Sequence, residues 1–132
     1  MEVRMALNPL EQFFSKVGAR DVSGALAVID DATVFEPQGP ESLPIYGRFV
    51  GKGGVERLLG TLAEQFETER FEIREWAEAG DYVFAYGYMQ HRVRKTGRIF
   101  KSDFAVVAQI EGNVIRHYRI FEDTAAAVAA FA

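Results

Sequence analysis

Apolar residues follow two different periods along this chain. In the first half they recur every three or four positions, as on one face of a helix, whereas in the second half they mostly alternate with polar residues, as in strands. The first half therefore predicts three helices, which begin near Asn8, Asp21 and Val55. The third helix has the clearest apolar stripe, formed by Val55, Leu58, Leu59, Leu62 and Phe66.

Four strands are expected after the third helix, and turns at Gly80, Gly97 and Gly112 join them. Strands that are joined by tight turns pair in antiparallel fashion. A short strand over residues 32–35 precedes the third helix, and a short alanine-rich helix ends near Phe131. Helices first and a meander afterwards predict an α+β fold with the helices on one face of a sheet. The strands of the meander are expected at residues 71–77, 82–94, 99–110 and 114–121.

The short strand over residues 32–35 ends at an acid. Glu36 stands against Pro37, just before a loop that is rich in glycine and proline. A carboxyl group beside apolar Val34 and Phe35 can be partly desolvated, which raises its pKa toward the range of a useful general base. We therefore expect Glu36 at the wall of a small-molecule pocket. The alternatives are a solvated loop acid and a carboxylate that is neutralised by an arginine.

The composition is that of an ordinary soluble globular protein. The 132 residues are 48% hydrophobic and 26% charged, which fits one domain over residues 1–132. There is no apolar run of about 18 residues, so no membrane span is expected, and residues 1–7 do not read as a signal peptide. The absence of cysteine excludes disulfides and thiolate chemistry, and it fits a cytoplasmic location.

The charge balance disfavours a nucleic-acid partner. The net charge is −4, whereas a phosphate backbone attracts basic surfaces. One basic cluster exists, at residues 92–101, but it surrounds Thr96-Gly97 and is typical of a solvated hairpin tip.

No metal or cofactor is expected. The two histidines, His91 and His117, fall on different predicted strands and lack the spacing of a metal motif. There is no nucleophile elbow of the GxSxG type. The glycines at 51, 53 and 54 match neither a dinucleotide fingerprint nor a P-loop, and we interpret them as turn glycines. Carboxylates and aromatic residues around a cavity remain as the candidate chemistry.

A second acid, Asp103, stands at the start of an otherwise apolar strand. Strand alternation places Asp103 on one face and Phe104 on the other, and the sequence leaves open which of the two points inward. In the last strand His117, Arg119 and Phe121 share a face. If that face is inward, Arg119 needs a partner such as Glu36, because an unpaired buried charge is costly. The alternative is an exposed sheet face or a dimer contact.

The order helix, helix, strand, helix, meander resembles the NTF2-like superfamily, and specifically its SnoaL-like and ketosteroid-isomerase-like branch. The resemblance covers nearly the whole chain. It implies a cone in which a curved antiparallel sheet wraps around the N-terminal helices and encloses an apolar pocket, and a homodimer formed through the sheet. The motifs that carry it are residues 30–39 (DDATVFEPQG), Tyr46-Gly47 with Gly51, Thr96-Gly97-Arg98 and residues 119–124 (RIFEDT).

The resemblance also implies roles for single residues. Ketosteroid isomerases carry their base in the motif Asp-Asp-Ala-Thr-Val-x-Asp-Pro, and Glu36 stands at that position. Their oxyanion hole is a tyrosine and a protonated aspartate. Phe13 stands at the tyrosine position, and Phe104 stands at the aspartate position unless the register shifts by one residue to Asp103. Loss of such a donor costs on the order of a hundredfold in rate or more, so a steroid isomerase is not expected.

Two functions are therefore expected from the sequence. In the first, Glu36 abstracts a proton next to a carbonyl of a small apolar or polycyclic substrate, and the product is isomerised or cyclised without a cofactor. Asp103, the second expected catalytic residue, or His117 or Arg119 stabilises the developing oxyanion. In the second, the pocket binds a small ligand without catalysis, or the chain serves as a dimeric module. The residues expected to contact the ligand are Phe13, Phe104, His117, Arg119 and Phe121.

Overall fold

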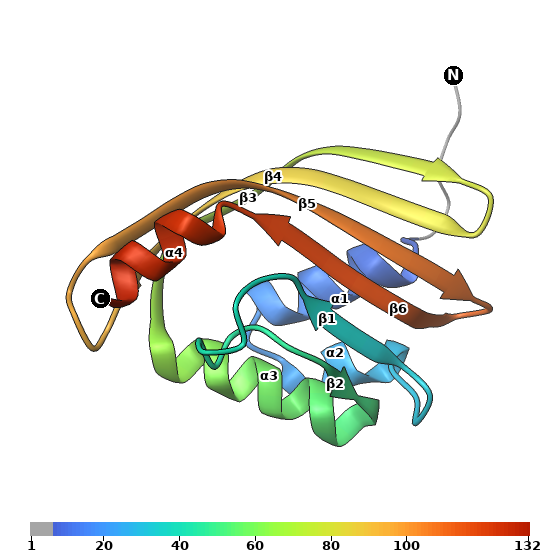
Figure 1. Cartoon of the computed structure of the whole chain (residues 1–132). Coiled ribbons are helices and arrows are strands. Elements are labelled where there is room, and N and C mark those ends of the chain that lie inside the picture. Colours follow the sequence, from blue (N-terminus) through green and yellow to red (C-terminus); the bar gives the residue numbers. More distant parts are fainter. Residues whose placement is uncertain (1–6) are drawn as a thin grey trace.

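A computed structural model describes residues 7–132 and consists of a curved sheet that arches over helices (Figure 1). No signal peptide is expected in residues 1–7, and of these residues 1–6 lie outside the described part of the chain. The helices are α1 (Pro9–Gly18), α2 (Val22–Ala25), the 3-10 turn η1 (Leu26–Val28), α3 (Gly51–Gln65) and α4 (Thr124–Phe131). The strands are β1 (Val34–Pro37), β2 (Phe49–Val50), β3 (Phe66–Ala79), β4 (Tyr82–Val93), β5 (Ile99–Glu111) and β6 (Val114–Glu122).

The described strands form one six-stranded sheet in the order β2-β1-β6-β5-β4-β3. The meander β3 to β6 is antiparallel throughout, as the turn-linked pattern predicts. The pair β1 and β6 is parallel, so the sheet is mixed. The expected α+β fold is confirmed. The pairing of β1 with β6 joins two segments that lie far apart in the sequence.

Several boundaries differ from those predicted. Phe66 ends the apolar stripe of α3 in sequence, but it begins β3, because its ring packs against His91 and Phe100 of the sheet. Helix α3 begins earlier than expected, at Gly51, so the glycines at 51, 53 and 54 belong to its first turn. Strand β1 is shifted by two residues, to Val34–Pro37, and therefore includes Glu36.

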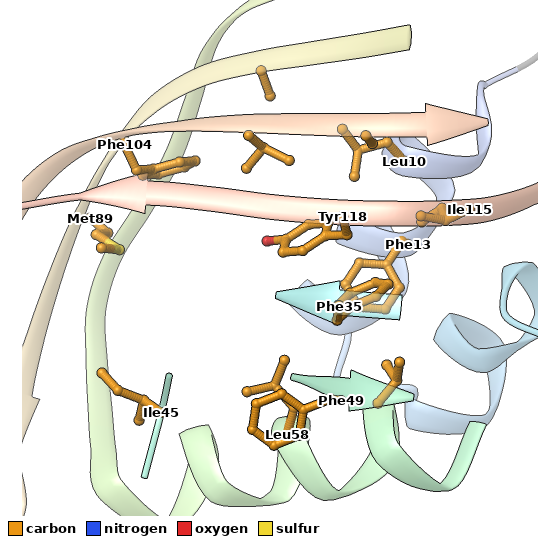
Figure 2. Packing of buried hydrophobic residues seen from close by; sticks show 14 of the residues in the cluster. Leu10, Phe13, Phe35, Ile45, Phe49, Leu58, Met89, Phe104, Ile115 and Tyr118 are labelled. Carbon is orange, nitrogen blue, oxygen red and sulfur yellow. The ribbon is translucent and has the colours of Figure 1, made fainter. Parts of the chain in front are cut away.

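The hydrophobic core lies between the helices and one face of the sheet, which we call the inner face (Figure 2). Its centre is aromatic: Phe35 of β1 stacks on Tyr118 of β6 with 4.2 Å between ring centroids, and Phe13 of α1 lies 5.2 Å from Phe35. Phe104 is buried on the same face. None of the helices between residues 7 and 132 has the length and apolar composition that crossing a bilayer requires.

Candidate functional site

The alternation of side chains along β1 and β6 separates the candidate residues onto two faces. Phe35 is paired with Tyr118 and points into the core, whereas the next pair along, Glu36 and Arg119, points to the opposite face. We call this opposite face the outer face. His117 lies two residues before Arg119 on β6, so its side chain also points to the outer face.

A tight turn fixes the start of β1 and thereby the position of Glu36. The Asp30 carboxylate accepts the backbone N–H of Ala32 and two hydrogen bonds from Arg116, at 2.8 and 3.2 Å. This contact with Arg116 lowers the pKa of Asp30. The buried Thr33 hydroxyl donates to the carbonyl oxygen of Ile115 at 2.7 Å. The motif Asp-Asp-Ala-Thr therefore anchors β1 to the beginning of β6.

Glu36, His117 and Arg119 form what we call the outer cluster. The Nε2–H of His117 donates to the Oε1 of Glu36 at 2.6 Å, and the Nη2 of Arg119 lies 3.9 Å from the same oxygen. The Glu36 and His117 side chains are 27% and 30% exposed, and that of Arg119 is 47% exposed. Within the described residues, no hydrogen bond or ion pair reaches the Oε2 of Glu36. The cluster is thus a half-buried carboxylate with one oxygen available.

The other predicted residues are divided between the core and the surface. Asp103 is an exposed outer-face residue whose carboxylate lies 3.7 Å from Arg74, and Phe104 is buried against Phe71. The question that the sequence left open is therefore answered: Phe104 points inward. Phe13 packs in the core, and Phe121 is exposed on the outer face. Of these residues, only His117 and Arg119 lie with Glu36.

A second carboxylate, Glu122, lies on the inner face at the end of β6, and with Tyr46 it forms what we call the inner pair. The buried Tyr46 hydroxyl donates to the Oε2 of Glu122 at 2.7 Å. Burial raises the pKa of Glu122 to about 7, and the hydrogen bond from Tyr46 opposes part of that rise. Burial and the nearby Glu122 charge raise the pKa values of Tyr46 and Tyr118 well above their usual range.

A cavity of about 280 Å³ opens beside Glu122 and is lined by Gln38, Gly39, Phe121, Glu122 and Thr124. The ring of Tyr46 lies behind Gly39, where an added Cβ would come within 2.6 Å of it. The sequence carried one signal for this carboxylate that we did not use. Strand alternation places Glu122 on the same apolar face as Tyr118 and Ile120, where an ionisable group is unusual.

His91 is a further buried side chain whose pKa is shifted. His91 stacks on Phe66 with 4.4 Å between ring centroids, and its Nδ1 lies 2.9 Å from the hydroxyl of Thr68. Burial lowers the pKa of His91 to about 4, so it is neutral at physiological pH. Over residues 7–132 no group of three or more histidine, aspartate or glutamate side chains is arranged to hold a metal ion.

Comparison with solved structures supports the fold. The chain is 26% identical to an NTF2-like protein from Burkholderia xenovorans, with a TM-score of 0.84 and 92% of each chain covered. An NTF2-like protein from Burkholderia thailandensis has a TM-score of 0.85 at 21% identity, covering 96% of this chain and 99% of its own. A protein of ketosteroid isomerase-like fold from Catenulispora acidiphila has a TM-score of 0.76 at 10% identity, covering 92% and 90%.

A search of curated proteins finds no match to this sequence. The model of the SnoaL-like domain, in contrast, matches residues 10–118, which is most of the chain. That span contains α1, the turn before β1, Glu36 and His117. The chain therefore belongs to the SnoaL-like domain family and has the NTF2-like fold.

Proposed function

We propose that the protein catalyses cofactor-free proton transfer on a small carbonyl compound, which leads to isomerisation or cyclisation. The observation that carries the proposal is the outer cluster. Glu36 stands at the position of the catalytic base in the ketosteroid isomerases, which the chain resembles, and it lies 2.6 Å from the Nε2 of His117 and 3.9 Å from Arg119. One carboxylate oxygen is thereby left beside two groups that can stabilise negative charge.

In the proposed reaction Glu36 is the general base. Its Oε2 takes a proton from the carbon next to the carbonyl, the C–H electron pair forms a C=C bond, and the carbonyl π electrons move onto oxygen. Arg119 stabilises the resulting enolate oxygen by its charge, and His117 keeps Glu36 in position through its hydrogen bond to Oε1. The proton then returns to a different carbon in an isomerisation. In a cyclisation the enolate carbon attacks a second carbonyl, whose oxygen is protonated.

The surroundings of the outer cluster favour an apolar substrate. Strand pairing places Val107 of β5 beside Arg119 and Ala105 of β5 beside Phe121. Tyr86 of β4 is paired with Ala105 from the other side. Tyr86 and Phe121 are 43% and 44% exposed, so aromatic surface borders the acid. This surface is open in a single chain. A second copy packed on the outer face would enclose it, so the proposed function includes a homodimer through the sheet, in the cytoplasm as the absence of cysteine favours.

The experiment follows exchange of the hydrogens next to a ketone, measured by NMR in D₂O with 2-tetralone and a panel of β,γ-unsaturated cyclic ketones. We expect Glu36→Gln to lower the exchange rate by about 10²- to 10⁴-fold, because a positioned general base contributes that much. Glu67→Gln, which changes an exposed acid paired with Arg94, is the matched control. Equal rates for Glu36→Gln and the control would refute the proposal. Sedimentation equilibrium, which distinguishes one chain from two, tests the homodimer.

One observation favours non-catalytic ligand binding as the second candidate function. Phe13 supplies no hydroxyl group, and Asp103 is paired with Arg74 on the outer face, so the oxyanion donors of a ketosteroid isomerase are not assembled. In that case the protein binds carbonyl compounds from the same panel without accelerating their exchange. Saturation of tyrosine or tryptophan fluorescence with no change in exchange rate would identify this outcome.

A further inference from the structure

The inner pair is not used by the proposed reaction, because it lies on the other face of the sheet. Glu122 and Arg119 are three residues apart on β6, and their side chains point to opposite faces. The cavity beside Glu122 is formed by the loop after β1 and by the junction of β6 with α4. A ligand in this cavity therefore meets a carboxylate that is distinct from Glu36.

The electrostatics of this cavity are unusual, since none of its lining side chains is cationic. The groups that interact with Glu122 are the hydroxyl of Tyr46 and the phenol of Tyr118. The neighbouring acid, Asp123, caps α4 through the N–H of Ala126, and its charge acts on Tyr46. Within residues 7–132 no arginine, lysine or histidine forms an ion pair with Glu122, and only its Oε2 accepts a hydrogen bond. A buried carboxylate without a counter-ion is costly, and a cationic ligand would relieve that cost.

The second feature of the cavity is an exposed aromatic ring. Phe121, whose side chain belongs to the outer face, lines it together with Glu122 at the end of β6, where residues of both faces border the cavity, and it is 44% exposed. The face of an aromatic ring attracts ammonium groups, and quaternary ammonium ligands are recognised by such rings together with carboxylates. Gly39 also lines the cavity, and its lack of a side chain lets the loop after β1 pack directly against the ring of Tyr46. The net charge of −4 adds a general attraction for cations.

We propose that the cavity formed by Gln38, Gly39, Phe121, Glu122 and Thr124 binds a small organic cation, an amine or a quaternary ammonium compound. Glu122 supplies the counter-charge and Phe121 the aromatic face. Tyr46 holds the carboxylate in place by its hydrogen bond to Oε2, which leaves Oε1 as the acceptor for the ligand in this proposal. Thr124 and Gln38 offer hydroxyl and amide oxygens to a ligand that carries N–H or O–H groups.

The proposal predicts a link between binding and protonation. The pKa of Glu122 is about 7, and a bound cation favours the ionised carboxylate. Affinity should therefore fall about tenfold from pH 8 to pH 6, and close to one proton should be released per ligand bound at pH 6. A neutral ligand that accepts a hydrogen bond from the protonated acid would show the opposite dependence on pH.

The test uses isothermal titration calorimetry of the full-length chain with choline and with 3,3-dimethyl-1-butanol, in which carbon replaces the charged nitrogen. We expect choline to bind at least tenfold more tightly than the alcohol, and Glu122→Gln to remove that preference while Glu67→Gln keeps it. Titration in buffers of different ionisation enthalpy measures the released proton in the unmodified protein, so the proposal does not depend on the variant alone.

Three results would overturn the proposal. Equal affinity for choline and the alcohol would make the cavity a merely apolar site. Choline binding weaker than about 10 mM at pH 8 would show that it does not bind cations usefully. Tighter binding at pH 6 than at pH 8 would show that the ligand requires the neutral acid. Because the ketone exchange experiment depends on Glu36 and this one on Glu122, either proposal can fail without the other.

Discussion

The outer cluster and the inner pair contain the same functional group in opposite surroundings. Glu36 is half-buried and lies next to an imidazole and a guanidinium, whereas Glu122 lies on the inner face with a phenol as its hydrogen-bonding partner. The pKa of Glu122 rises to about 7 because no positive charge compensates its burial. The comparison teaches that burial of a carboxylate with only a neutral hydrogen-bonding partner moves its change of charge to near neutral pH.

The largest effect expected from this difference between Glu36 and Glu122 is on how the free energy of unfolding depends on pH. The folded state keeps Glu122 protonated up to about pH 7, whereas its ordinary pKa is 4.5. Its contribution to the free energy of unfolding is therefore complete below pH 4.5 and is lost as pH rises to 7, by at most about 3 kcal/mol. His91 acts in the opposite sense. Its pKa falls from 6.5 to about 4, so stability is lost as pH falls through that window, again by about 3 kcal/mol.

In the unmodified protein these two contributions oppose each other between pH 4.5 and 6.5. We expect Glu122→Gln to leave only the His91 contribution, so that the free energy of unfolding rises steadily from pH 4.5 to 6.5. Urea unfolding at several pH values measures the difference between the two proteins. If the profile of Glu122→Gln is parallel to that of the unmodified protein, Glu122 does not titrate in this range and the contrast with Glu36 is lost.

An intermediate effect is expected for Tyr46→Phe. The hydroxyl of Tyr46 stabilises the ionised form of Glu122, so its removal should raise the pKa of Glu122 above 7. The variant should lose about 1–2 kcal/mol of stability at pH 8, where the carboxylate is left unpaired, and less at pH 5. NMR titration of the Glu122 carboxyl carbon gives the pKa directly, and an unchanged value would show that the hydrogen bond is not formed in solution.

The smallest effect is expected at the outer cluster. Arg119→Gln should change stability by less than about 0.5 kcal/mol, because the side chain is half exposed and its nitrogen lies 3.9 Å from Glu36. Arg116→Gln is the matched control, since Arg116 is less exposed and donates two hydrogen bonds to Asp30. We expect it to cost more, because two hydrogen bonds to a charged partner are lost. Thermal unfolding of both variants measures the two losses of stability. A larger loss for Arg119→Gln than for Arg116→Gln would mean that the outer cluster is structurally important.

The sequence predicted the parts of the fold that depend on local pattern. Turns with glycine and alternating strands located the meander, and the order of helices and strands gave the α+β fold. The two-residue strand β2 was missed, because so short a run carries no period. Phe66 was assigned to a helix because its spacing fits α3, and only tertiary contacts with the sheet place it in β3.

The candidate site was harder to predict, because its residues meet through a pairing between distant segments. The sequence located Glu36, His117 and Arg119 separately and suggested Arg119 as a partner of Glu36, which agrees with the contact observed at 3.9 Å. It did not place Glu36 on the outer face, since the strand predicted over residues 32–35 ended before Glu36 and left it outside the alternation. Tyr46 and Glu122 lie 76 residues apart, and no local pattern joins them.

The parallel pairing of β1 with β6 has a consequence for the order of folding. The hairpins of the meander close over short loops, whereas Glu36 and His117 are 81 residues apart, and closing so long a loop carries a larger entropic cost. We therefore expect the meander to form first and β1 to dock late. During synthesis neither carboxylate can acquire its partners before β6 has left the ribosome, so both candidate sites become competent only after β6 has been made.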